Sequence, residues 1–128
     1  MRYLALDVGD RTIGLAVGDD TFGLVRPLKT VRRRGIAADL ATLRDIVSTE
    51  EVAALVVGLP LNLQGEVAYQ AQRVRGFAES ARSLGLPLEL VDERFTTAEA
   101  ARRGADDLDA GAAVVLLEDF FSERRRRS

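Results

Sequence analysis

The feature that most constrains the fold is a continuous apolar run at residues 53–59, AALVVGL, which is followed by Pro60. A strand without polar alternation is typical of a parallel sheet that is covered on both faces. Because parallel strands are joined by crossover connections, helices are expected before and after this run. The run therefore predicts an α/β fold with helices on both faces of a sheet.

The first nineteen residues, MRYLALDVGDRTIGLAVGD, predict a strand hairpin. Residues 2–8 and 12–18 alternate apolar residues with polar or small ones, and a short turn at residues 9–11 separates them. A third strand over residues 24–31 would extend this antiparallel meander. Because Pro27 cannot donate a backbone hydrogen bond, we expect this third strand to be irregular or to lie at an edge.

The rest of the chain predicts four helices and two further strands, in the overall order β-β-β-α-β-α-β-α-α. Such an order predicts one domain over residues 1–122, with a five-stranded mixed sheet flanked by helices on both faces, and an Arg-rich tail over residues 123–128. The helices are expected at residues 36–48, 66–84, 98–103 and 106–121, and the strands at residues 53–59 and 87–93.

Composition limits the chemistry available to the chain. Its 128 residues include no cysteine and no histidine, which excludes disulfides, thiolate zinc sites and Ser-His or Cys-His catalysis. An enzyme of this composition would use carboxylates, Lys, Tyr or Arg. No apolar run approaches the roughly 18 residues of a membrane span, and no export signal is recognisable. We therefore expect a cytoplasmic protein with no membrane contact.

The charge of the chain points in two directions. The net charge of −2 argues weakly against a nucleic-acid partner. Nearly all the cations are arginines, however, and they cluster at residues 32–34 and 124–127. A solvated surface explains such clusters, and so does phosphate binding, because the guanidinium group forms paired hydrogen bonds with phosphate oxygens.

Three acids are expected at one edge of the predicted sheet. Asp7 ends the first strand and Glu93 ends the last one, and the carboxyl ends of parallel strands share an edge where open α/β folds bind ligands. Asp109 begins the apolar stripe of the last helix, where the helix dipole alone would also favour an acid. Carboxylates brought together repel one another unless a cation lies between them. The pattern predicts a site for hard divalent cations, Mg²⁺ or Mn²⁺.

Two such ions about 4 Å apart can activate a water and stabilise the charge of a phosphodiester displacement without any histidine. Phosphodiester hydrolysis therefore matches both the acids and the composition. Two bound ions would also change the formal charge from −2 to about +2, which weakens the electrostatic objection to a nucleic-acid substrate.

Four segments follow one another along the chain: DVGDRTIGLAVGD (7–19), VVGLPLNLQGE (56–66), VDERFTT (91–97) and DAGAAVVLLEDFF (109–121). In this order they resemble the signature segments of the bacterial YqgF/RuvX family, and the resemblance covers the chain to about residue 121. It implies an RNase H-like fold related to RuvC-type Holliday junction resolvases. It also implies a nuclease that matures the 5′ end of pre-16S rRNA, with junction resolution as the competing description.

The family's acids match Asp7, Glu93 and Asp109, so the resemblance implies that these three bind the metal ions and carry catalysis. It also implies substrate contacts, with a structural alternative for each residue. Arg11 would hold a phosphate or serve as a turn cation, and Arg94 would bind phosphate or neutralise the acids. Asn62 would contact substrate or cap a loop.

The fifteen residues between Glu93 and Asp109 are fewer than the family usually has there, and they include Asp106 and Asp107 as alternative ligands. The short segment also motivates a second hypothesis, a nucleic-acid-binding module with little catalysis. A junction resolvase would require a homodimer with two symmetric sites, whereas an RNA-processing nuclease would not. An actin-like phosphotransferase fits poorly, because those enzymes need two such domains to enclose a nucleotide.

Overall fold

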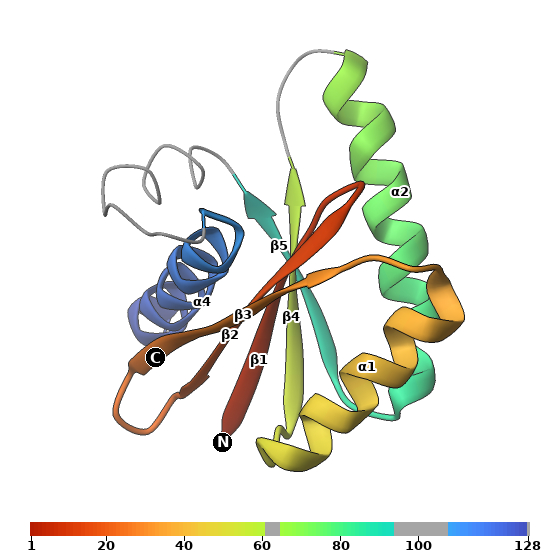
Figure 1. The fold of residues 1–128 in the computed structure, drawn as a ribbon. Helices are drawn as coiled ribbons and strands as arrows, with labels where there is room; N and C mark the ends of the chain where they lie inside the picture. Colours follow the sequence, from red (N-terminus) through yellow and green to blue (C-terminus); the bar gives the residue numbers. More distant parts are fainter. Residues whose placement is uncertain (61–64, 94–107, 128) are drawn as a thin grey trace.

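Five strands form one mixed sheet in the order β3-β2-β1-β4-β5 (Figure 1). The structure is a computed structural model, and it describes residues 1–60, 65–93 and 108–127. The central strand is β1, and β3 and β5 lie at the two edges. The strands are β1 (Arg2–Val8), β2 (Thr12–Asp19), β3 (Leu24–Arg32), β4 (Ala54–Pro60) and β5 (Leu88–Glu93).

The strand directions confirm the meander and the crossovers predicted from sequence. β1 pairs with β2 and β2 with β3 in antiparallel fashion, whereas β1, β4 and β5 are parallel. The register between β2 and β3 shifts near Pro27, where Lys29 pairs with Leu15 but Pro27 pairs with Ala16. Proline has no N–H to donate to the neighbouring strand, which explains why the pairing is irregular here. The irregular third strand predicted from Pro27 is thus confirmed.

Helices cover both faces of the sheet, as predicted (Figure 1). α1 (Ile36–Thr49) and α2 (Gly65–Ala81), which continues into a 3₁₀ turn at Arg82–Leu84, lie on one face. α4 (Leu108–Arg127) lies on the other. No helix in the described ranges is long and apolar enough to span a membrane. The helix expected at residues 98–103 lies outside the described residues.

α4 extends beyond the predicted end of the last helix. The arginines at positions 124–127, expected in a tail, form its last turn. Arginine is a good helix former, and positive charge at the carboxyl end of a helix interacts favourably with the helix dipole. The apolar pattern stops at Phe121, so periodicity alone could not show that the helix continues.

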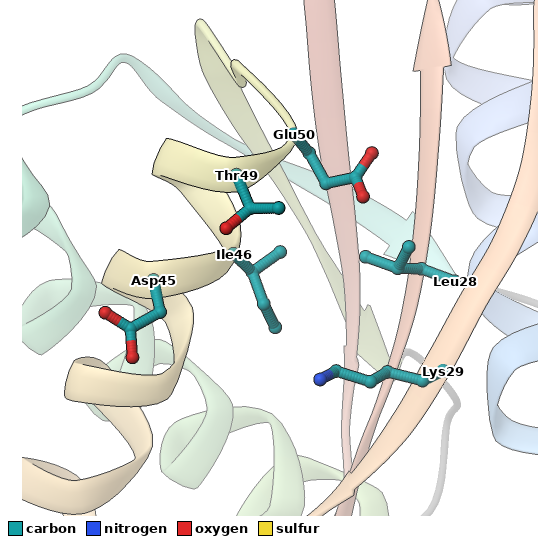
Figure 2. A pocket seen from close by; sticks show the side chains of 6 residues that line it. All are labelled: Leu28, Lys29, Asp45, Ile46, Thr49 and Glu50. Carbon is teal, nitrogen blue, oxygen red and sulfur yellow. The ribbon is translucent and has the colours of Figure 1, made fainter.

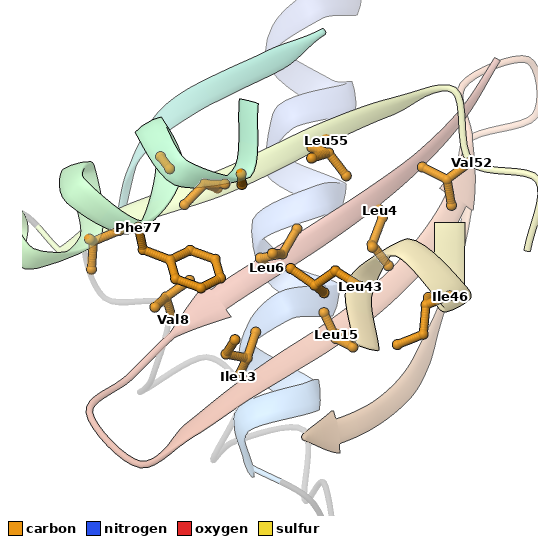
Figure 3. Packing of buried hydrophobic residues seen from close by; sticks show 14 of the residues in the cluster. Leu4, Leu6, Val8, Ile13, Leu15, Leu43, Ile46, Val52, Leu55 and Phe77 are labelled. Carbon is orange, nitrogen blue, oxygen red and sulfur yellow. The ribbon is translucent and has the colours of Figure 1, made fainter. Parts of the chain in front are cut away.

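The face covered by α1 and α2 is packed with large aliphatic side chains. Strand alternation sends Leu4, Leu6 and Val8 of β1 to this side, where Leu43 of α1 and Phe77 of α2 cover them (Figure 3). Each of these five side chains is almost entirely buried. This cluster extends along the full length of β1.

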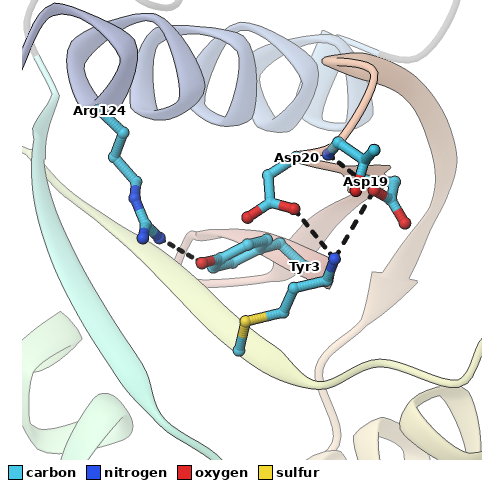
Figure 4. A network of polar contacts seen from close by, with 6 residues as sticks. Tyr3, Asp19, Asp20 and Arg124 are labelled. Carbon is cyan, nitrogen blue, oxygen red and sulfur yellow. Dashed lines mark hydrogen bonds and ion pairs between the residues drawn. The ribbon is translucent and has the colours of Figure 1, made fainter. Parts of the chain in front are cut away.

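The face covered by α4 contains smaller strand residues, among them Ala5, Ala16 and Ala54. Aromatic rings fill this face near the start of β1, where Tyr3 packs against Phe120 with ring centroids 5.2 Å apart. Arg124 donates a hydrogen bond to the Tyr3 hydroxyl (Figure 4). The small strand residues let α4 approach the sheet closely. The contacts of Tyr3 with Phe120 and Arg124 hold the carboxyl end of α4 against the start of β1.

A small ionic network lies at the same end of the sheet (Figure 4). The amino group of Met1 lies 2.9 Å from the Asp20 carboxylate and 3.7 Å from that of Asp19. The hydrogen bond to Asp20 raises the pKa of the Met1 amino group. The backbone N–H of Thr21 donates to Asp19 and lowers the pKa of that carboxyl. All of these groups are exposed and lie far along β1 from Asp7.

Candidate active site

Asp7 lies on the α4 side of the sheet, near the carboxyl end of the central strand. Tyr3 and Ala5 of β1 belong to the core beneath α4, and position 7 continues this alternation. Its side chain is partly exposed, in a strand whose neighbouring residues Leu6 and Val8 are buried. The acid therefore leaves the apolar core at the edge where ligands bind in α/β folds.

Glycines lie on both sides of Asp7. Asp7 pairs with Gly14 of β2. On the other side, the register that pairs Leu6 with Val57 of β4 places Gly58 beside Asp7 when it continues by one residue. Neither glycine has a positive φ, so the backbone conformation does not require glycine at either position. The consequence is steric: the two strand positions directly beside Asp7 contribute no side chain next to this carboxylate.

β5 ends at the same edge. Gly58 of β4 pairs with Val91, and Pro60 pairs with Glu93, the last residue of β5. Val91 packs against the core under α4, and position 93 lies two residues farther along the strand. Strand alternation therefore assigns positions 7 and 93 to the same face of the sheet.

α4 brings its first turn to this edge as well. Its last turns contact Tyr3 near the start of β1, through Phe120 and Arg124, so the helix runs opposite to β1. A helix of 20 residues is about 30 Å long, enough to pass the whole of β1. Position 109, in the first turn, thus lies toward the end of the sheet that carries Asp7.

The backbone therefore brings positions 7, 93 and 109 to one edge and one face. The side chains of Glu93 and Asp109 are outside what the structure describes, as are Asp106 and Asp107 entirely, so their metal binding stays a prediction. Among the described side chains, no group of three potential ligands is close enough to hold an ion. Of the predicted set, only the side chain of Asp7 belongs to this described part.

The turn that follows Asp7 is held from several directions. The Gly9 amide donates to the Thr12 carbonyl at 2.8 Å and closes the turn. Arg73 of α2 lies 2.9 Å from the Asp10 carboxylate. The Arg33 amide donates to the Arg11 carbonyl at 2.8 Å, which extends the ladder between β2 and β3. These contacts fix the backbone that leads away from the candidate site.

A buried ion pair behind this turn was missed from the sequence. Asp39, 1% exposed, accepts a hydrogen bond from Arg33 Nε at 3.2 Å and one from the Arg34 amide at 2.9 Å. Arg33 also donates to the Gly9 carbonyl at 3.0 Å and lies over the Phe77 ring. Asp39 is a first-turn acid of α1 next to an arginine run, and this signal could have suggested the pair.

The predicted substrate-binding residues are only partly placed. The Arg11 side chain is exposed in the turn between β1 and β2. Asn62 and Arg94 lie outside the described residues. Within the described part of the chain, Arg11 is thus the predicted contact whose position beside the candidate site can be followed.

Two hollows in the described surface lie away from Asp7. One, of about 230 Å³, lies between β3 and α1, on the opposite face of the sheet, and is lined by residues such as Leu28, Lys29 and Asp45 (Figure 2). The other, of about 440 Å³, lies between β5 and the last turns of α4, beside Val91 and Arg124. Neither is lined by Asp7, so the candidate site is defined by strand ends and not by either hollow.

Comparison with known proteins gives a family and a set of relatives. The family model RuvX, described as Holliday junction resolvase, matches residues 1–123. A relative from Anaeromyxobacter sp. (strain Fw109-5), named "Putative pre-16S rRNA nuclease", is 44% identical, and the match covers 97% of this chain and 98% of the relative. A relative of the same name from Moorella thermoacetica is also 44% identical, over 99% of this chain and 83% of its own length.

Solved structures agree on the fold. RuvC of T. thermophilus in complex with Holliday junction substrate has a TM-score of 0.67 at 18% identity, with 98% of this chain and 96% of that one covered. A fowlpox virus resolvase in complex with Holliday junction DNA has a TM-score of 0.55 at 8% identity and covers 97% of this chain and 99% of its own. These likenesses confirm the predicted RNase H-like architecture.

Proposed function

Because the chain belongs to the RuvX family, we propose that it is a divalent-metal-dependent nuclease that processes the 5′ end of pre-16S rRNA in the cytoplasm. The observation that carries this proposal is the position of Asp7. Its carboxylate lies at the carboxyl end of the central strand, between two positions that lack side chains. The names of the nearly full-length relatives supply the substrate.

The residues at this edge fit a hard cation. Asp7 offers carboxylate oxygens, and the backbone brings positions 93 and 109, both acidic, to the same edge and face. Mg²⁺ and Mn²⁺ prefer such oxygen ligands, and the chain has no histidine or cysteine to offer a softer set. Asp7, Glu93 and Asp109 would hold two ions. When bound, the ions would lower the pKa of a water and offset the negative charge that develops on the phosphate.

The protein's own part is to position the substrate. β1 is paired on both sides, so the backbone of Asp7 is held in a rigid sheet, and a rigid carboxylate needs little reorganisation during the reaction. Gly14 and Gly58 add no side chain beside Asp7, so neither would compete with a phosphodiester for the space next to its carboxylate. Arg11, Arg94 and Asn62 would orient the phosphates on either side of the bond to be broken.

A second candidate substrate comes from the description of the family model, which names a Holliday junction resolvase. Resolution of a four-way junction requires two cuts related by symmetry, and therefore two copies of this site in a homodimer. Processing of an RNA end requires only one. The two substrates use the same acids, so the choice between them depends on oligomeric state and on direct comparison of the substrates.

The test is cleavage of two labelled substrates, a pre-16S rRNA 5′ fragment and a four-way DNA junction, with Mg²⁺ or Mn²⁺ and with EDTA. We expect Asp7→Asn to reduce cleavage at least about 10³-fold, a loss of about 4 kcal/mol of transition-state stabilisation. The melting temperature should change little, because Asp7 lies at the edge of the core. Asp45→Asn, at an exposed position of α1 on the opposite face, is the control and should cleave like the parent protein.

The outcomes separate the hypotheses. Full activity of Asp7→Asn, or cleavage that persists in EDTA, contradicts the proposed mechanism. Cleavage of the junction but not the RNA, by a protein that is dimeric in solution, favours the resolvase. If the parent protein binds both substrates and cleaves neither, it is a binding module.

A further inference from the structure

The three consecutive arginines after β3 do not share one role. Val31 packs against the core under α1 and α2, and Arg33 is turned to this same side, over the ring of Phe77. Arg33 is 19% exposed and is neutralised by the buried Asp39. Arg32 and Arg34 flank it in the chain and are exposed. The run therefore contains one internal arginine and two that face solvent.

Arg32 lies on the same face of the sheet as Asp7. Across the sheet, Asp7 pairs with Gly14, and Gly14 pairs with Thr30. The next position toward the carboxyl edge on this face pairs Thr12 with Arg32. Gly14 itself is buried, whereas Thr12, nearer the end of β2, is partly exposed. Arg32 therefore lies two residues beyond Thr30, the β3 residue in line with Asp7, toward the edge of the sheet that carries the candidate site.

Arg11 extends this basic surface to the turn after Asp7. Its carbonyl accepts the hydrogen bond from the Arg33 amide, which brings the turn next to the end of β3. Arg34 follows in the chain, and its own amide is bound to Asp39. These two contacts use backbone atoms, so they hold Arg11 and Arg34 in place while leaving both guanidinium groups at the surface.

The acids nearby do not neutralise these three arginines. Among the described residues, Asp39 pairs with Arg33 and Asp10 pairs with Arg73, whereas Arg11, Arg32 and Arg34 have no acidic partner within ion-pair distance. Elsewhere, Arg2 and Arg26 share Glu50, and Arg82 pairs with Glu79. In a chain of net charge −2, these three neighbouring arginines make the surface next to Asp7 locally basic.

We propose that Arg11, Arg32 and Arg34, here called the phosphate track, bind the sugar–phosphate backbone of a nucleic-acid strand whose scissile bond lies at Asp7. This rests on the proposed nuclease function and adds where the strand runs, past the end of β2, where Thr12 pairs with Arg32, toward the end of β3. Guanidinium groups suit this partner because they form paired hydrogen bonds with phosphate oxygens. Contacts to phosphates position a strand without reading its sequence.

The test measures binding without cleavage. A fluorescein-labelled single-stranded RNA and a DNA of matching sequence are titrated by anisotropy, without divalent metal, with Asp7→Asn protein over a range of salt concentrations. Each phosphate contact to a single strand contributes about 0.7 to the slope of log Kd against log salt. Replacing all three track arginines with glutamine should therefore lower the slope by about 2 and weaken binding about 100-fold at 0.1 M salt, equally for RNA and DNA.

A matched triple variant serves as the control. Arg44→Gln, Arg75→Gln and Arg82→Gln remove the same charge from exposed positions on α1, on α2 and in the 3₁₀ turn that follows α2. We expect this protein to keep the salt slope of its parent. Melting temperatures of both triple variants should stay close to that of the parent, since the side chains replaced are exposed.

Three results would overturn the phosphate track: no measurable binding by the parent, an unchanged slope in the track variant, or an equal fall of the slope in the control. The result is separate from that of the cleavage test. A protein that cleaves nothing but loses its salt slope only in the track variant keeps the track and loses the nuclease. A protein that cleaves normally with an unchanged slope does the reverse.

Discussion

The two faces of the sheet differ in how they use the same central strand. On the side of α1 and α2, β1 presents Leu4, Leu6 and Val8, and all three are buried in one aliphatic cluster. On the side of α4, it presents Tyr3, Ala5 and Asp7, which change from an aromatic ring to a small residue to a partly exposed acid. One face is uniform along its length, and the other changes character from end to end.

This difference shows how a small domain can separate stability from function. The aliphatic face contributes the hydrophobic stabilisation, which is roughly proportional to buried apolar area. On the α4 face, Tyr3 at the amino end of β1 packs against Phe120 and Arg124 of α4. The carboxyl end of β1 is not needed for this contact, and there the strand carries Asp7 between two glycines. The candidate site therefore occupies one end of one face, and substitutions on the two faces should have separable effects.

The largest loss of stability is expected for Leu43→Ala in α1. Leu43 is 1% exposed within the aliphatic cluster, so its truncation removes buried surface and leaves a cavity. We expect the free energy of unfolding in urea to fall by about 2 to 5 kcal/mol. Below its melting temperature the variant should cleave nucleic acid at the parental rate. A folded Leu43→Ala protein with much slower cleavage would show that the two faces are not separable.

A smaller loss is expected for Arg33→Met, which removes one partner of the buried ion pair. Asp39, which is 1% exposed in the parent protein, would keep the Arg34 amide but lose the guanidinium that balances its charge. Because an unpaired buried charge is costly, we expect unfolding to become easier by about 2 to 3 kcal/mol. The double variant Arg33→Met/Asp39→Leu, measured by the same urea titration, should recover part of the loss. No recovery would show that the contacts of Arg33 with Gly9 and Phe77 matter more than the pair.

Much of this architecture could be predicted from the sequence, because it depends on local patterns. Alternation in residues 2–18 predicted the hairpin, and the apolar run before Pro60 predicted the parallel strand β4 and its crossovers. The site was predictable as far as strand ends go, since Asp7 and Glu93 each end a parallel strand. The metal-binding role of Asp7, Glu93 and Asp109, and the contacts of Asn62 and Arg94, stay predictions.

What the sequence could not show depends on contacts between distant segments. Arg33 binds the carbonyl of Gly9, 24 residues earlier, and rests on Phe77 of another helix. No periodicity distinguishes this arginine from Arg32 and Arg34 on either side of it. The role of Gly14 and Gly58 could not be predicted for the same reason. It becomes visible only when the strand register places both glycines beside Asp7.

A moderate loss of stability, with a clear loss of function, is expected for Gly14→Val. Gly14 is paired directly with Asp7, and side chains at directly paired positions have Cβ atoms about 5 Å apart, so an isopropyl group would stand beside the carboxylate. Valine is well suited to strands and Gly14 has no positive φ, but Gly14 is buried, so its neighbours must move to make room and unfolding should become easier by about 1 to 3 kcal/mol. Cleavage should nevertheless fall more than about tenfold, because a displacement of about 1 Å at a reacting group can cost about 100-fold.

The matched change on the other side of β2 is Ile13→Val, which removes one methylene from the aliphatic face and should alter stability by about 1 kcal/mol without slowing cleavage. Both variants are measured by urea unfolding and by cleavage of the same labelled RNA. If Gly14→Val cleaves at the parental rate while remaining folded, the space beside Asp7 is not where the phosphodiester binds. The reaction is assigned to the α4 side because Asp7 and its paired residue Gly14 lie there. Without that assignment, the two faces of the sheet would differ only in how their side chains pack.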